Sequence, residues 1–210
     1  MKISTALKAL AGTAVVMLPL TAMAESNFQT GAAALTSTAH VDFQVTIPKI
    51  LYLRVGTGSA YPTTLANNVG VDLVSFSPAA AVVGNGTAVA GTGGDLTNGV
   101  ETAAIISNSG NVTLTATATG ALSDATADSI AYTQITTTAA ALTGAYTLLP
   151  APVLTNGASA PVVLTAPATK VITADAKWTY AYANATTPPA GTYGGVNTNN
   201  SRVTYTATMP

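Results

Sequence analysis

The most regular stretch of the chain is Val112-Thr113-Leu114-Thr115-Ala116-Thr117-Ala118-Thr119, in which apolar and hydroxyl-bearing side chains alternate without a break. Successive side chains of a β-strand point to opposite faces, so this pattern predicts a strand with one buried face and one threonine-lined face. β-Branched threonine suits the exposed side of such a pleated surface. The stretch Val203-Thr204-Tyr205-Thr206-Ala207-Thr208 repeats the pattern. A pattern that occurs twice in this way is expected of two strands that have similar positions in a sandwich.

Other short strands are expected at the spacing typical of a sandwich or barrel. Their predicted ranges are 41–47, 50–55, 69–76, 81–83, 87–90, 101–107, 111–119, 130–137, 170–173, 177–183 and 202–208. The turn formers Asn85-Gly86 and Asn108-Ser109-Gly110 predict two hairpins, and the proline-rich stretch Leu148–Pro167 predicts a loop with short edge pieces.

Helix periodicity is nearly absent beyond the first residues, and no crossover helices are expected. The chain is therefore predicted to be all-β, an antiparallel β-sandwich of about nine or ten short strands. The alternative, a parallel β-solenoid, requires a fixed repeat period that the sequence lacks.

The first 24 residues have the features of a secretory signal. Lys2 and Lys8 form a positive region before an apolar stretch over 9–20, and Ala22-Met23-Ala24 forms a small-x-small cleavage site. The apolar stretch is shorter than the roughly 20 residues of a membrane span. We expect a signal peptide over 1–24, a flexible N-terminal extension over 25–38 and a single sandwich domain over 39–210. The expected location is outside the cytoplasm of a bacterium, in the periplasm, at the cell surface or in the medium, with no membrane span after signal removal.

Residues that carry chemistry are scarce: 7 basic, 8 acidic, one histidine and no cysteine among 210 residues. Loss of the two signal lysines leaves a net charge of −3 and no basic cluster, which argues against nucleic acid as a partner. Acid–base and nucleophilic catalysis draw on the residue types that are missing. We expect a non-enzymatic protein with no cofactor, and one that is stabilised by its core since no disulfide can form.

Two weak signals for chemistry remain. His40 is the only histidine; it cannot form a zinc site alone, and no Gly-x-Ser-x-Gly motif accompanies it, so a hydrolase is the third alternative. The stretch from Asp95 to Glu101 could offer oxygen ligands to calcium, but it lacks the spacing of an EF-hand loop. Asp95 and Asn98 are also common turn formers, so a structural turn is the preferred interpretation and no metal site is predicted.

The concentrated aromatic row is Trp178, Tyr180 and Tyr182, on one face of a predicted strand. A sandwich rich in alanine and valine needs large side chains to fill its core, so a core stripe is favoured. The alternative makes these three residues the contact platform of a secreted or periplasmic module that binds a carbohydrate or another small ligand.

The stretch Pro189-Ala190-Gly191-Thr192-Tyr193, followed by Val203–Thr208, resembles the closing strands of bacterial surface immunoglobulin-like domains. Pilin subunits assembled by a chaperone and usher, and WxL-type surface domains, have similar runs. The resemblance covers about the last thirty residues and implies an immunoglobulin-like sandwich with a structural or adhesive surface role. The chain departs from these families in having no disulfide, in the interruption over 194–201, and in lacking a Trp-x-Leu motif at Trp178.

An open sheet edge must be paired or blocked, and strand addition by a neighbour's extension uses such an edge for assembly. We expect residues 25–39 to act as the donor and an assembly edge formed by Val203, Tyr205 and Ala207 to act as the acceptor. The expected function is that of an exported, fimbria-like structural or adhesive subunit whose partners are further copies or other surface proteins.

Overall fold

The computed structural model describes residues 25–210 except 59 and 127, so the predicted signal peptide lies outside the described residues. The described chain divides into an extension that ends at Ile47 and a compact unit, Pro48–Pro210. Within the described ranges, no helix is both long enough and apolar enough to cross a membrane. The compact unit is built from β-strands and two short 3-10 helices.

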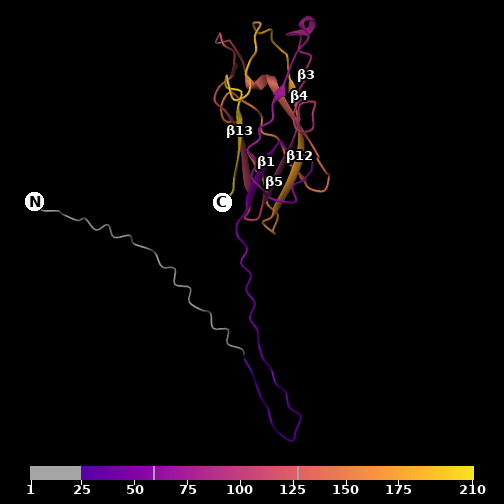
Figure 1. Ribbon diagram of the computed structural model, residues 1–210, viewed down its shortest axis with the longest axis vertical. Helices are drawn as coiled ribbons and strands as arrows, with labels where there is room; N and C mark the ends of the chain where they lie inside the picture. The colour runs from indigo at the N-terminus through magenta and orange to yellow at the C-terminus, as the bar shows by residue number, and fades with distance from the viewer. Residues whose placement is uncertain (1–24, 59, 127) are drawn as a thin grey trace, which may run out of the picture. The chain divides into compact units, whose positions relative to one another are not determined.

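Two main sheets make up the compact unit (Figure 1). The larger sheet has β5 (Val100–Ser107) between β1 (Leu51–Val55) and β12 (Ile172–Tyr182). The far edge of β12 pairs with β9 (Ile135–Ala140), β10 (Thr147–Leu148) and β3 (Val89–Ala90). The smaller sheet has the order β11 (Val162–Leu164), β6 (Val112–Ala118), β13 (Val203–Thr208).

Short elements complete the unit. They are the pair β2 (Val74–Ser75) and β4 (Thr92–Gly93), the pair β7 (Leu122–Ser123) and β8 (Ser129–Ile130), and the 3-10 helices η1 (Ala80–Val82) and η2 (Tyr132–Gln134). All the strand pairs are antiparallel except β10 with β12.

The core lies between the inner faces of the two sheets. Ile105 and Trp178 come from the larger sheet, Val112 and Leu114 from the smaller, and all four are fully buried. The Trp178 ring also lies 5.3 Å from the ring of Tyr205 on β13, so aromatic contact joins the sheets. The predicted all-β antiparallel sandwich is confirmed.

The alternating stretch that begins at Val112 folds as its pattern predicts. Its apolar residues are buried on β6, while Thr113, Thr115 and Thr117 face outward. β13 pairs with β6 in a register that places Thr206 opposite Thr115, so the two stretches that echo each other in sequence are neighbours in the sheet.

The two predicted hairpins are wrong. β5 and β6 flank Asn108-Ser109-Gly110 but belong to different sheets, so this turn carries the chain across the core. Asn85-Gly86 does form a turn, with Gly86 at φ +79°, but it follows the 3-10 helix η1 instead of a strand. Turn residues specify a change of direction and leave open which strand becomes the partner.

Further strand predictions need correction. The predicted strand over 130–137 is interrupted by η2, and the one over 81–83 lies largely in η1. The ranges 170–173 and 177–183 belong largely to one long strand, β12, because Ala174, Asp175 and Ala176 continue the ladder with β5. The predicted strand over 69–76 is reduced to Val74–Ser75, and residues 66–73 have no strand partner among the described residues.

The extension, residues 25–47, contains no strand. It runs out and back as an extended chain (Figure 1), and the His40 ring nitrogen Nδ1 lies 2.7 Å from Oε2 of Glu25. The prediction of a half-buried strand over 41–47 is wrong, because the apolar side chains of this stretch are exposed. Their exposed fractions are Val41 74%, Phe43 91%, Val45 83% and Ile47 75%.

Candidate functional site: a groove beside unpaired backbone

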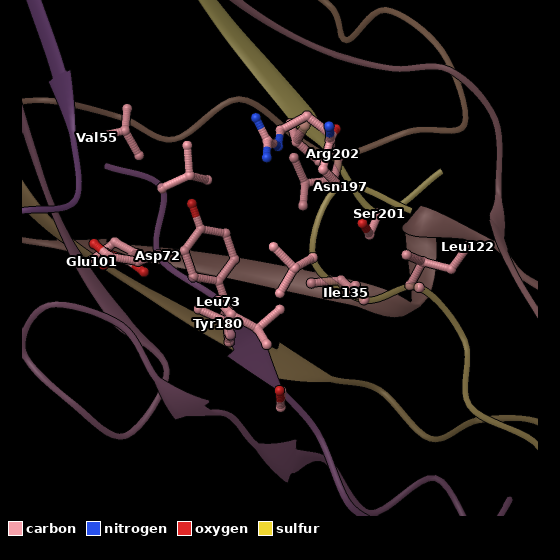
Figure 2. A pocket seen from close by; sticks show the side chains of 18 of the residues that line it. Val55, Asp72, Leu73, Glu101, Leu122, Ile135, Tyr180, Asn197, Ser201 and Arg202 are labelled. Carbon is pink, nitrogen blue, oxygen red and sulfur yellow. The ribbon is translucent and has the colours of Figure 1, made fainter. Parts of the chain in front are cut away.

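The compact unit contains a large open groove with a volume of about 1690 Å³. One wall is formed by residues 62–78 and the other by residues 188–205, which lead into β13. Apolar and aromatic side chains, including Leu73, Leu122, Ile135 and Tyr180, project between the walls (Figure 2). The groove is therefore elongated between two chain segments and has a largely apolar floor.

The β13 wall presents unpaired backbone. Among the described residues, β13 forms a ladder with β6 on one side and with no strand on the other. Val203, Tyr205 and Ala207, the predicted assembly edge, are half-buried on its inner face and pack against the core. An edge of this kind offers a row of N–H and C=O groups to an incoming strand.

The opposite wall also has unpaired backbone, over residues 66–73 (the 66–73 wall). Its apolar side chains are unusually exposed, with Val69 at 97%, Val71 at 61% and Leu73 at 48%. The backbone N–H of Thr57 donates to Oδ2 of Asp72 at 3.0 Å, which fixes one end of the wall. Alternating apolar side chains without a sheet partner indicate a segment that is suited to pairing but is not paired here.

Tyrosines line the floor. The hydroxyls of Tyr180 and Tyr205 lie 2.9 Å apart and join the larger sheet to β13, and burial raises the pKa of Tyr205 to about 12. Tyr182 is also buried, and its hydroxyl has no hydrogen-bond partner among the described residues.

Trp178, the third member of the predicted aromatic platform, does not line the groove. It is fully buried, and its Nε1–H donates to the Leu149 carbonyl at 2.9 Å. Its ring therefore fills the core and offers no face to a ligand. The structure brings Tyr180 and Tyr182 to the groove floor and leaves Trp178 beneath it.

A group of carboxyls lies at one end of the groove, where Figure 2 shows Asp72 and Glu101 side by side. Side-chain oxygens of Asp72, Asp95 and Glu101 lie within 4.8 Å of one another. Asp95 accepts hydrogen bonds from the backbone N–H groups of Gly58 (2.7 Å) and Thr102 (2.8 Å) and from the Thr102 hydroxyl. These donors engage the Asp95 carboxylate and hold the turn before β5 in place.

Glu101 is the unusual member of this group, because it projects from β5 on the same face as Trp178 and is only 5% exposed. Burial raises its pKa to about 8; the charges of Asp72 and Asp95 act in the same direction, and a hydrogen bond from the Asp95 backbone opposes them. A carboxyl in this position is mostly protonated at neutral pH.

His40 lies in the extension and is paired with Glu25, and both side chains are largely exposed. Comparison with known proteins gives no match to the chain among protein-family models, curated proteins or solved structures.

Sequence reasoning identified the β13 edge and two of the floor tyrosines but missed the 66–73 wall and the pairing of Asp72 with Glu101. The alternation of Val69, Val71 and Leu73 carried a signal, which was interpreted as an ordinary strand. No sequence signal places Asp72 beside Glu101, because the contact depends on how the wall folds over β5.

Proposed function

We propose that the protein is an exported, non-enzymatic surface subunit that assembles with further copies by strand addition, in a fimbria-like structural or adhesive role. The observation that carries this proposal is the unpaired edge of β13 beside an open apolar groove whose other wall is also unpaired. One inserted strand would satisfy both backbone edges and cover the floor.

The donor that fits best is residues 41–47 of a second copy, rather than the 25–39 segment expected from the sequence. Its apolar side chains alternate on one face and are 74–91% exposed, whereas Asp42, Gln44 and Thr46 lie on the other. An inserted strand needs this alternation, with one face toward the floor and the other toward solvent. Residues 25–38 include Leu35 but lack such a row.

Burial gives the insertion its driving force. Each of the four apolar side chains contributes about 1.5–3 kcal/mol when it is transferred fully from water to an apolar environment. Backbone hydrogen bonds to the two edges add directionality, and the cost is the ordering of the segment. Phe43 is the most exposed of the four and has the most apolar surface to bury.

The test is assembly of the purified mature chain, followed by electron microscopy and sedimentation. Phe43→Asp places a charge on the inserting face and should abolish polymers while leaving a folded monomer. Gln44→Asp places the same charge on the opposite face and should assemble like wild type. Deletion of residues 25–38 should also leave assembly intact, which separates the two candidate donors.

Two results would contradict this proposal. Polymers of the Phe43→Asp variant at wild-type levels would exclude the donor segment. A wild-type mature chain that remains monomeric at high concentration would exclude self-assembly altogether.

The second candidate function, binding of a carbohydrate or another small ligand, is favoured by one observation, the unpartnered hydroxyl of Tyr182 at the groove floor. Because this oxygen is covered by its neighbours, a ligand with a hydrogen-bond acceptor would engage it by displacing them while stacking on the neighbouring tyrosines. Saturable quenching of intrinsic fluorescence by a sugar, lost in Tyr182→Phe, would support this function over strand addition.

A further inference from the structure

Three acidic side chains from three different segments meet at one end of the groove. Asp72 comes from the 66–73 wall, Asp95 from the turn before β5, and Glu101 from β5 itself. No lysine, arginine or histidine nitrogen of the described residues lies within 4.0 Å of these carboxyls. Like charges at such short range cannot all be ionised without a large cost, so at least one proton must be retained.

The hydrogen bonds indicate where that proton resides. Asp95 accepts from two backbone N–H groups and one hydroxyl, so its oxygens are already engaged. Asp72 accepts one N–H, from Thr57. Glu101 accepts one N–H, from Asp95 at 3.2 Å, and is the most buried of the three. The proton therefore belongs to Glu101, with Asp72 as the available acceptor.

Gly56 brings these two carboxyls together. A Cβ added at Gly56 would lie 2.5 Å from Oδ2 of Asp72 and 2.9 Å from Oε2 of Glu101, so both oxygens rest against a backbone position that only glycine leaves open. Gly56 has φ +78°, and its N–H donates to the Thr102 carbonyl at 2.7 Å. The two carboxyls thus share a small space in which a carboxyl–carboxylate hydrogen bond can form.

We propose that the Asp72–Glu101 pair is a proton-dependent clasp, which holds the 66–73 wall against β5 while one proton is shared and releases the wall when that proton is lost. The clasp regulates the groove, and its effect on assembly rests on the proposed function. With both carboxyls ionised, repulsion displaces Asp72, because it lies on a wall with no strand partner, whereas Glu101 is fixed in the β5 ladder.

The other titratable groups around Glu101 do not account for a release of the 66–73 wall at alkaline pH. Asp95 is held apart from the pair by its three hydrogen-bond donors. Tyr180 and Tyr205 face Glu101 from β12 and β13, and burial raises the pKa of both hydroxyls, so they keep their protons while Glu101 ionises. On β1, Arg54 points to the other face of the sheet with its guanidinium on the Ala60 carbonyl. Arg202, just before β13, lines the same groove (Figure 2), but it forms no ion pair within 4.0 Å among the described residues.

The direction of the effect follows from the raised pKa of Glu101. Near pH 6.5 the carboxyl is protonated and donates to Asp72, and the wall is held. Near pH 9.5 it is ionised, and the wall is released. If the wall supplies one edge for the inserted strand, assembly weakens by at least tenfold between these two values.

Two readouts test the clasp in the full mature chain. The first follows the Val71 and Leu73 methyl resonances by NMR from pH 6.5 to 9.5 in a Phe43→Asp background, which does not depend on assembly. The second measures the critical concentration for polymers at both pH values without that substitution. Glu101→Gln and Asp72→Asn each supply an amide N–H in place of the shared proton, so either variant should keep the wall resonances unchanged with pH. In the control variant Asp128→Asn, which removes a carboxyl away from the clasp, the wall resonances should change with pH as they do in wild type.

Several outcomes would overturn the clasp. The first is that the wall resonances of wild type do not change with pH. The second is that both amide variants still show the same change at alkaline pH as wild type. Release of the wall by a chelator at pH 6.5 would show that a cation, rather than a proton, holds the pair. If the resonances respond as expected but no polymer forms at any pH, the clasp stands and the proposed function fails. Asp72 is exposed, so Asp72→Asn keeps the test open even if Glu101→Gln does not fold.

Discussion

Residues 41–47 and residues 112–118 have nearly the same sequence pattern, but the first stretch is exposed and the second is buried. In both stretches, every second side chain is apolar and the residues between are polar or small. The apolar side chains of β6 are at most 5% exposed, whereas those of the extension are at least 74% exposed, although Phe43, Val45 and Ile47 are larger than most of their counterparts. Alternation therefore shows that a segment is suited to form a strand with one apolar face. Whether it is buried depends on a partner.

The largest expected effect tests the buried half of this comparison. Leu114→Ala should reduce the free energy of unfolding by about 2–5 kcal/mol, because it leaves a cavity in a close-packed core. Val45→Ala, the matched change in the extension, should stay within about 0.5 kcal/mol when it is measured on monomers. Urea denaturation of both variants provides the measurement. Similar losses in the two variants would mean that residues 41–47 are buried in the monomer.

The second prediction extends the comparison to polar side chains. Asn184 is fully buried; its Oδ1 accepts from the Gly84 N–H and its Nδ2 donates to the carbonyls of Val82 and Thr87. Asn184→Ala leaves those groups without partners and should cost about 1–3 kcal/mol. Asn197 has the same positive φ but is exposed, so Asn197→Ala should be nearly neutral in the same assay. Equal effects would show that backbone conformation, rather than the buried hydrogen bonds, makes Asn184 important.

The third prediction concerns the pH dependence of stability. The pKa of Glu101 is raised to about 8 from an ordinary value of 4.5, so the folded state retains a proton that the unfolded state loses. The stabilisation linked to this group is complete below pH 4.5 and is lost as the pH rises to 8, by roughly 1–2 kcal/mol because the open groove admits solvent. The difference in unfolding free energy between wild type and Glu101→Gln, measured from pH 4 to 9, should show this slope. A constant difference would contradict it.

The smallest expected effect concerns the polar half of the pattern. Thr115 and Thr206 lie opposite each other on the outer face of the smaller sheet. Thr206→Ala should cost about 0.2–1 kcal/mol through loss of a cross-strand pair. The double variant with Thr115→Ala should cost less than the sum of the two single variants, and thermal unfolding of the three proteins gives the coupling. Strict additivity would indicate that the threonines provide only a hydrophilic surface.

Much of the fold follows from local pattern. The strands over 101–107, 111–119 and 202–208 could be located within a residue or two, because each has alternating apolar side chains that face the core of the folded unit. The burial of Trp178 could also be predicted, since few other large side chains were available to fill the core.

The pairing of strands could not be predicted in the same way. Nothing in Asn108-Ser109-Gly110 distinguishes a hairpin from a crossing between sheets. Which of the two forms depends on whether β5 and β6 pair with each other or with the later strands β12 and β13. The same limit applies to the site. The β13 edge was visible as an alternating run, but the groove exists only where the 66–73 wall remains unpaired.

The crossing at residues 108–110 has a consequence for the order in which the protein folds. Since β5 and β6 do not pair with each other, β5, which can pair early with β1, completes its ladder only with β12, and β6 completes its ladder only with β13, each more than sixty residues later in the chain. Neither half of the sandwich can close while the ribosome is still making residues 172–208. Such distant pairings make folding slow and leave the nascent polypeptide open for longer. The part of the chain that emerges first therefore stays without its final strand partners until the last residues have been made.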